Sequence, residues 1–160
     1  MSECCSVKPT DWPAVMTCPV SSRRSKQVDL LTVRSLVRQL PLGMPPTAYY
    51  FCDDPACDIV YFPSNSEAPI FRRSDLMVRV GVKETQEPTP VCYCFGFSRQ
   101  DIWEEIRKTG KSTAAGRIAT EVNAGNCACE VKNPSGNCCL GNVHGVVKQF
   151  ERQRSLEEDS

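Results

Sequence analysis

Cysteine constrains this chain more than any other residue type. The 160 residues contain 11 cysteines, and the N-terminal sequence has no basic and apolar pattern of a secretory leader. We therefore expect a cytoplasmic location, where thiols stay reduced and clustered cysteines are more often metal ligands than disulfides. The odd number of cysteines also fits complete disulfide pairing poorly. These features predict a protein built around cysteine-bound metal.

The charge balance argues against two classes of partner. Lys and Arg number 19, and so do Asp and Glu, so the chain has no basic surplus for nucleic acid or for an anionic membrane surface. No apolar run approaches the length of a membrane-spanning helix. We expect no nucleic-acid partner and no membrane insertion.

The composition changes along the chain predict an α+β protein in four segments. Residues 1–17 lack periodicity and are expected to be a disordered tail. Residues 18–88 indicate a β-rich unit, residues 89–154 a helical unit, and residues 155–160 an acidic tail.

The β-rich unit contains several short runs of aromatic and β-branched residues. The runs at 48–52 and 58–62 flank a loop with a cysteine at each end and predict a hairpin. Residues 68–73 and 77–82 are further strand candidates, and residues 30–40 predict a short helix, with a strand as the alternative. Four basic side chains nearby indicate a solvated strand face: Arg72, Arg73, Arg79 and Lys83.

Helix start and stop signals follow in the second half. Ser98, with an acidic residue three positions later, predicts the start of a helix that Gly110 ends. Ser112 can cap a second helix that stops near Gly125, and a third helix is expected from about Cys139 to Gln153.

The helical unit carries six cysteines at helix edges or in the loop between helices. Two antiparallel helices return the chain so that Cys94 lies beside residue 127 or 129. Four thiolates gathered there fit either Zn²⁺ or an iron–sulfur cluster. A C-x-C pair suits a dinuclear cluster if both of its thiols bind one iron and a distant pair binds the other. The six cysteines are Cys92, Cys94, Cys127, Cys129, Cys138 and Cys139.

A family resemblance covers about residues 18–148. The segments "YYFCDDPACDIVYF", "VRVGVKE", "PVCYC" and "CACEVKNPSGNCCLG" resemble the N-terminal domain of CopZ-type copper chaperones, which combines a [2Fe–2S] cluster with a mononuclear zinc site. The helical part also resembles bacterioferritin-associated ferredoxin. The resemblance implies that the cluster ligands are Cys92, Cys94, Cys129 and Cys139. Cys127 and Cys138 remain rivals because each lies close to one of these positions.

The first cysteine group indicates a zinc-ribbon or treble-clef-like knuckle. Its thiols are Cys18, Cys52 and Cys57, and zinc ligation there contributes folding energy. The resembling domains usually carry C-P-x-C in the first half, where this chain has Ser21. Three replacements for the fourth ligand stay open: a thiol of Cys4 or Cys5, a carboxylate of Asp53 or Asp54, or water.

The resemblance implies one-electron transfer in copper handling, in which Cu(II) is reduced to Cu(I) for delivery. An electron-transfer protein or metallochaperone is expected rather than a classical enzyme. The expected cofactors are a [2Fe–2S] cluster and zinc, with Cu(I) as a further candidate. The chain has no C-x-x-C, so copper would need spare thiols, a separate copper chaperone or a copper-transport ATPase, besides an unknown electron donor.

Two other functions are predicted by the same residues. One is a colourless module in which zinc alone holds the thiols. The other is a soft-metal buffer that binds Cu(I) through spare thiols such as Cys4 and Cys5, since thiolates select Cu(I).

Overall fold

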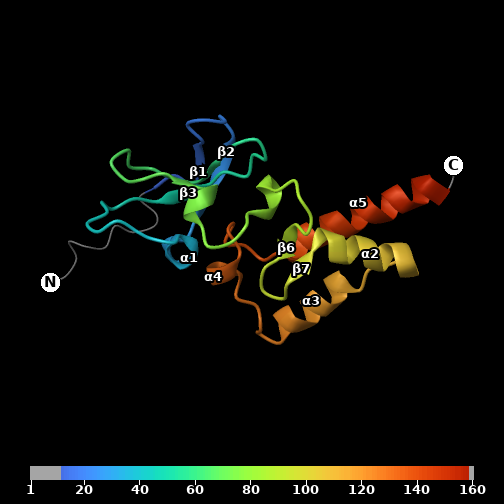
Figure 1. Cartoon of the computed structure of the whole chain (residues 1–160). Coiled ribbons are helices and arrows are strands. Elements are labelled where there is room, and N and C mark those ends of the chain that lie inside the picture. The colour runs from blue at the N-terminus through green and yellow to red at the C-terminus, as the bar shows by residue number, and fades with distance from the viewer. Residues whose placement is uncertain (1–11, 159–160) are drawn as a thin grey trace. The chain divides into compact units, whose positions relative to one another are not determined.

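The structure, a computed structural model, describes residues 12–158. The chain divides into two compact units. The first extends to Lys83 and includes Pro134–Gly136, and the second comprises Glu84–Asn133 and the chain from Asn137 onward. Figure 1 shows strands in the first part of the chain and mostly helices in the second. The α+β class predicted from the sequence is confirmed at this level.

A five-stranded antiparallel sheet forms the first unit, with neighbouring strands in sequence order. Its strands are β1 (Val15–Thr17), β2 (Arg24–Val28), β3 (Tyr49–Phe51), β4 (Ile59–Pro63) and β5 (Phe71–Arg72). The hairpin predicted from the two aromatic runs is confirmed, because β3 pairs with β4 in the register Tyr50 opposite Phe62. These two rings stack at 5.5 Å between centroids and are almost fully buried, so aromatic cross-strand pairing stabilises the centre of the sheet.

The predicted short helix is confirmed as α1 (Leu30–Leu36), which begins after Asp29, whose side chain accepts a hydrogen bond from Leu31 N at 2.9 Å. The strand predicted at 77–82 was wrong. Only a bridge between Val37 and Leu76 forms nearby, and a 3₁₀ turn, η4 (Gly81–Lys83), follows. Local bonds replace the ladder here, since Lys83 N donates to Val80 O at 2.9 Å.

The second unit begins with a hairpin of β6 (Pro90–Cys92) and β7 (Phe97–Ser98), which the sequence pattern does not predict. The helices that follow are α2 (Arg99–Thr109), α3 (Ala114–Asn123), α4 (Cys129–Lys132) and α5 (Leu140–Glu158). The start and stop signals of α2 are confirmed: Ser98 and Asp101 form a reciprocal capping box, and Gly110 ends the helix at a φ of +87°.

Apolar side chains from α2, α3 and α5 form the core of this unit. Ile102 and Ile106 of α2 and Ile118 of α3 are at most 1% exposed, and Trp103 packs on Phe150 of α5 at 5.0 Å between ring centroids. This core fixes the start of α5, which Cys139 directly precedes.

Two segment boundaries differ from the predicted ones. The tail predicted at 1–17 contains β1, because Val15–Thr17 pair with β2, and residues 1–11 lie outside the described residues. The acidic tail predicted from residue 155 continues α5 as far as Glu158. The first boundary differs because a three-residue strand gives no periodic signal. The second differs because the salt bridge Arg154–Glu158 (3.5 Å) supports the last turn of α5.

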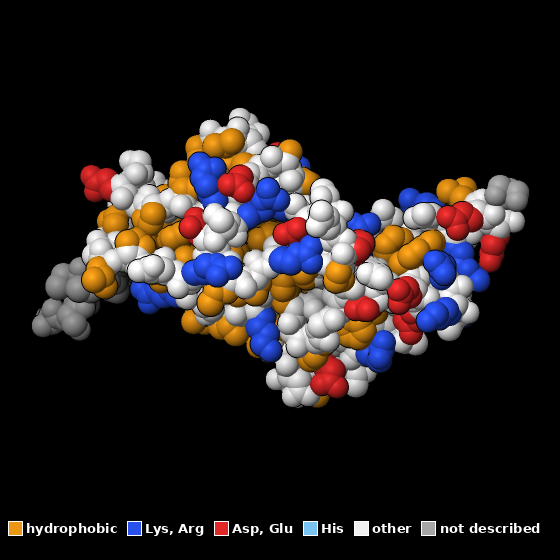
Figure 2. Space-filling view, in the orientation of Figure 1, with side chains coloured by type: hydrophobic (Ala, Val, Ile, Leu, Met, Phe, Trp, Pro, Cys, Tyr) orange, Lys and Arg blue, Asp and Glu red, His pale blue; other side chains and the backbone are white. Residues whose placement is uncertain are grey.

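No helix in the described range 12–158 is long and apolar enough to cross a membrane. On the face shown in Figure 2, Lys and Arg side chains are interspersed with Asp and Glu side chains. This mixture accords with the equal numbers of positive and negative residues in the sequence.

Candidate metal centres

Two turns of the first unit carry the three cysteines that lie among its described residues. Cys18 follows β1 in a tight turn closed by hydrogen bonds from Ser22 N to Cys18 O (3.0 Å) and from Cys18 N to Arg23 O (2.9 Å). Cys52 and Cys57 bound the loop between β3 and β4, so both turns place their thiols at the same site of the unit.

The three sulfurs lie within 4.8 Å of one another and are buried. Cys18 Sγ is 3.9 Å from Cys57 Sγ, close to the edge of about 3.8 Å that a tetrahedral site with zinc–sulfur bonds of about 2.3 Å requires. Three buried thiols at this spacing fit a soft metal ion better than they fit a plain apolar core.

The surroundings affect the protonation of these thiols differently. Burial alone would raise the pKa of Cys18, but hydrogen bonds from the Ser21 side chain and backbone outweigh it, so this pKa is lowered. Burial dominates at Cys52 and raises its pKa, although Ser21 and the charge of Lys83 act in the opposite direction. Metal binding at this site would therefore displace a proton from Cys52.

Lys83 is buried inside this unit, so the prediction that it lies on a solvated strand face was wrong. It is 2% exposed, and its Nζ donates to Asp54 O at 2.7 Å and to Cys57 O at 2.8 Å. Burial lowers the pKa of Lys83, while the nearby Cys52 and Cys57 act to raise it. A buried lysine is costly unless paired, so its position against the cysteine loop indicates an electrostatic role there.

Two of the predicted replacements for a fourth ligand are engaged elsewhere. The Asp53 carboxylate forms a 2.7 Å salt bridge with Arg23, and Asp54 Oδ1 accepts a hydrogen bond from Ala56 N at 2.9 Å. Cys4 and Cys5 lie outside the described residues.

In the second unit, four thiols come together from distant parts of the sequence. Cys139 Sγ lies 3.0 Å from Cys92 Sγ, and Cys94 Sγ lies 3.3 Å from Cys129 Sγ. Ala128 N also donates to Cys94 Sγ at 3.2 Å. The expectation that the C-x-C segment meets the loop near residue 129 is therefore confirmed as geometry.

The contacts join each thiol of the C-x-C pair with a thiol of the distant pair. Cys92, at the end of strand β6, contacts Cys139, and Cys94, in the following turn, contacts Cys129; the sharing of one iron by Cys92 and Cys94 stays a prediction. Two pairs of thiols are the donor set that two irons require.

Burial separates these cysteines from their sequence neighbours. Cys92, Cys129 and Cys139 are at most 6% exposed and Cys94 is half-buried, whereas the rivals Cys127 and Cys138 are exposed.

Hydrogen bonding sets the protonation of the paired thiols. The Cys139 thiol donates to the Cys92 sulfur, which lowers the pKa of Cys92 to about 6, and the same bond together with burial raises the pKa of Cys139. Burial, reinforced by Cys94, raises the pKa of Cys129 to about 12. Since thiolates bind metals and thiols do not, occupation of this site would release protons.

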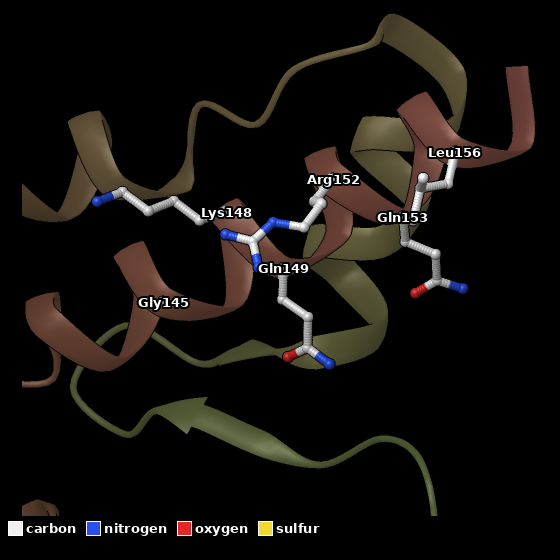
Figure 3. Close-up of a pocket in the computed structure, with 6 residues that line it drawn as sticks. All are labelled: Gly145, Lys148, Gln149, Arg152, Gln153 and Leu156. Carbon is white, nitrogen blue, oxygen red and sulfur yellow. The ribbon is translucent and has the colours of Figure 1, made fainter. Parts of the chain in front are cut away.

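A separate hollow on α5 contains no cysteine. It has a volume of about 420 Å³, and Figure 3 shows its side chains along one helix. Its lining consists of Gly145, Lys148, Gln149, Arg152, Gln153 and Leu156. We assign no ligand to it, because no metal-binding side chain contributes.

An antiparallel sheet with a three-thiol site and a helical unit with four further thiols define a cysteine-rich metal-binding protein. The family model of the CopZ-type zinc binding domain matches residues 15–77. The copper chaperone CopZ of Archaeoglobus fulgidus is 38% identical over 125 residues, which are 78% of this chain and 58% of that protein. The X-ray structure of the N-terminal domain of the same CopZ superposes with a TM-score of 0.64 at 36% identity, covering 82% of this chain and 97% of that one.

The chain belongs to the CopZ N-terminal domain family, and its zinc binding domain lies within the first unit. It spans 58% of the length of the curated relative.

Proposed function

We propose that this chain is a zinc and [2Fe–2S] protein that transfers single electrons in copper handling. The observation that carries the proposal is the convergence of Cys92, Cys94, Cys129 and Cys139 in two close pairs. When bound there and reduced by a separate electron donor, such a cluster would supply one electron, which reduces one Cu(II) to Cu(I), the form that thiolates carry. The copper chaperone named among the relatives supports the choice of copper as the substrate.

The residues around these four thiols suit a shielded redox group. Phe95, Phe97 and Trp103 pack against the buried core that contains Cys92, Cys129 and Cys139. Apolar cover limits access of water, and the amide of Ala128 donates to Cys94 Sγ, which stabilises negative charge on that sulfur. Both features tune a reduction potential.

Cys94 is the most exposed of the four proposed cluster ligands, being half-buried where the others are buried. We infer that electrons enter or leave on its side, because electron transfer is faster where the shielding layer of protein is thinnest. Copper delivery and the copper-transport partner follow from the same proposal, with zinc in the first unit acting as a structural ion.

Anaerobically purified protein tests the proposal by metal analysis and by EPR spectroscopy of the reduced state. We expect two irons per chain, visible absorption that bleaches on reduction, and one unpaired spin. Colourless protein with two zinc ions and no iron would instead support the zinc-only module.

Adjacent cysteines provide matched controls for the ligand assignment. Cys129→Ser and Cys139→Ser should abolish or strongly reduce the iron content, while the exposed neighbours tolerate Cys127→Ser and Cys138→Ser with the EPR signal intact. The opposite pattern would show that the exposed thiols are the ligands. After the electron-transfer test, Cu(II) is added to the reduced protein, and we expect one Cu(I) to form for each cluster oxidised.

A further inference from the structure

The three-thiol site of the first unit leaves one position of a tetrahedral zinc ion to fill. We propose that the hydroxyl of Ser21 is this fourth donor and that the buried Lys83 supplies the charge that balances the site. The inference rests on the proposed occupation of Cys18, Cys52 and Cys57 by zinc.

Distances place the Ser21 hydroxyl at a ligand position. With a zinc–sulfur bond of about 2.3 Å and a zinc–oxygen bond of about 2.1 Å, a tetrahedral site has sulfur–oxygen edges of about 3.6 Å. Ser21 Oγ lies 3.4 Å from Cys52 Sγ. Ser22 N donates to Cys18 O at 3.0 Å, so Ser21 lies in the same turn as a second of the three cysteines.

The local backbone holds this hydroxyl in place. Ser21 lies in the turn that Ser22 completes with a φ of +64°, and Arg23 N donates to Ser21 Oγ at 3.3 Å. A donor already fixed by its turn loses little conformational freedom on binding, which partly compensates for the weak affinity of zinc for a neutral hydroxyl.

Competing donors among the described residues are engaged. Arg23 pairs with the carboxylate of Asp53, and Ala56 N donates to the carboxylate of Asp54. The metal-binding group of His, Cys, Asp and Glu side chains found here includes the three cysteines and no carboxylate.

Charge explains why a neutral fourth donor suits this site. Zn²⁺ with three thiolates carries one net negative charge, whereas four thiolates would leave two. Lys83 brings one positive charge, and its Nζ donates to the backbone carbonyls of Asp54 and Cys57 beside the sulfurs. The three thiolates, zinc, Ser21 and Lys83 together are neutral, which lowers the cost of burying the site.

Cobalt(II) substitution in the full chain tests the assignment, because thiolate-to-metal absorption grows with the number of thiolates. Wild-type protein should show a tetrahedral spectrum with three thiolates at this site, after the contribution of the four thiols of the second unit, measured in a Cys18→Ala/Cys52→Ala variant, has been subtracted. Ser21→Cys should raise the charge-transfer intensity by about one third, as expected for a fourth thiolate. Ser21→Ala should weaken the tetrahedral bands and zinc binding by about tenfold, and Ser21→Thr, which keeps the hydroxyl, should restore both.

The double variant Cys4→Ser/Cys5→Ser tests whether an N-terminal thiol is the fourth ligand. We expect its spectrum to match the wild type, and loss of one thiolate contribution would overturn the assignment in favour of the N-terminal thiols. A Ser21→Ala spectrum and zinc affinity equal to the wild type would overturn it in favour of water. If wild-type protein binds neither cobalt nor zinc at the three cysteines, zinc occupation itself fails, and this result is distinct from the other two.

Discussion

Replacing Lys83 by Met tests how strongly a buried cation stabilises the three-thiol site. The methionine side chain nearly matches the lysine stem in volume but lacks the charge and both donors. Lys83 is 2% exposed, and its two acceptors are the carbonyls of Asp54 and Cys57, at 2.7 and 2.8 Å. The substitution therefore removes one donor from each carbonyl: Asp54 O still accepts from Cys57 N at 3.2 Å, whereas Cys57 O loses the partner that Lys83 provides.

The free energy that Lys83→Met is expected to cost has two parts. Leaving a carbonyl unsatisfied costs about 1–3 kcal/mol, partly offset because no cation is then buried, and this part affects the metal-free and the metal-loaded protein alike. A unit charge at a distance on the order of 6 Å from the anionic site, with an effective dielectric constant of about 20, contributes about 3 kcal/mol only when metal is bound. That difference corresponds to about a hundredfold loss of zinc affinity.

Competition with a chromogenic chelator measures the zinc affinity, and urea unfolding measures the stability with and without zinc. The exposed Lys26 of β2 provides the control Lys26→Met, for which we expect unchanged zinc affinity. Equal losses of stability in the zinc-loaded and metal-free forms of Lys83→Met would refute the electrostatic part of the reasoning and leave Lys83 as a hydrogen-bonding residue only.

Further predictions concern pH and stability. Burial raises the pKa of Tyr49 from 10.0 to about 12, so the protonated phenol stabilises the folded state, fully below pH 10. Between pH 10 and pH 12 the free energy of unfolding should fall by about 1.4 kcal/mol per pH unit, which urea unfolding at alkaline pH measures. Ser98→Ala removes the capping box of α2 and should cost about 1 kcal/mol in urea unfolding, whereas Ser155→Ala on the exposed side of α5 should cost much less. Ile106→Ala empties a position that is 0% exposed and should cost about 2–5 kcal/mol in thermal unfolding of the helical unit.

Local chemistry made some elements predictable from the sequence. Ser98 and Gly110 each act on the helical turn next to them, one at each end of α2. These residues themselves therefore specify where the helix begins and ends. The β3–β4 hairpin was equally predictable, because two aromatic runs flank a short loop.

Longer-range pairing limited the prediction elsewhere. β1 is a three-residue strand that forms by pairing with β2, and β6 and β7 are equally short strands that pair with each other. Strands this short carry no periodic sequence signal. The four-residue α4 is too short for a helical pattern, and Cys129 at its start is placed by its contact with Cys94.

Lys83 shows what the sequence of the candidate site could not specify. In the sequence it is one of several basic residues and indicates a solvated face. Its burial depends on the backbone carbonyls that the Cys52–Cys57 loop turns toward it, and those directions follow only from the folded loop. The cysteines themselves were evident from the sequence because few other residue types cluster in this way.

The segment 124–132, which precedes the three residues that belong to the first unit, contributes a single side chain, that of Cys129, to the hydrophobic cluster of the helical unit. Little buried apolar area therefore stabilises this stretch. With the proposed metal bound, sulfur–metal bonds provide the stabilisation that apolar packing does not. Its amide protons should then exchange slowly in the loaded protein and rapidly after the metal is removed, while those of α2 change much less. Metal binding would therefore order this stretch of backbone against helices that are already folded.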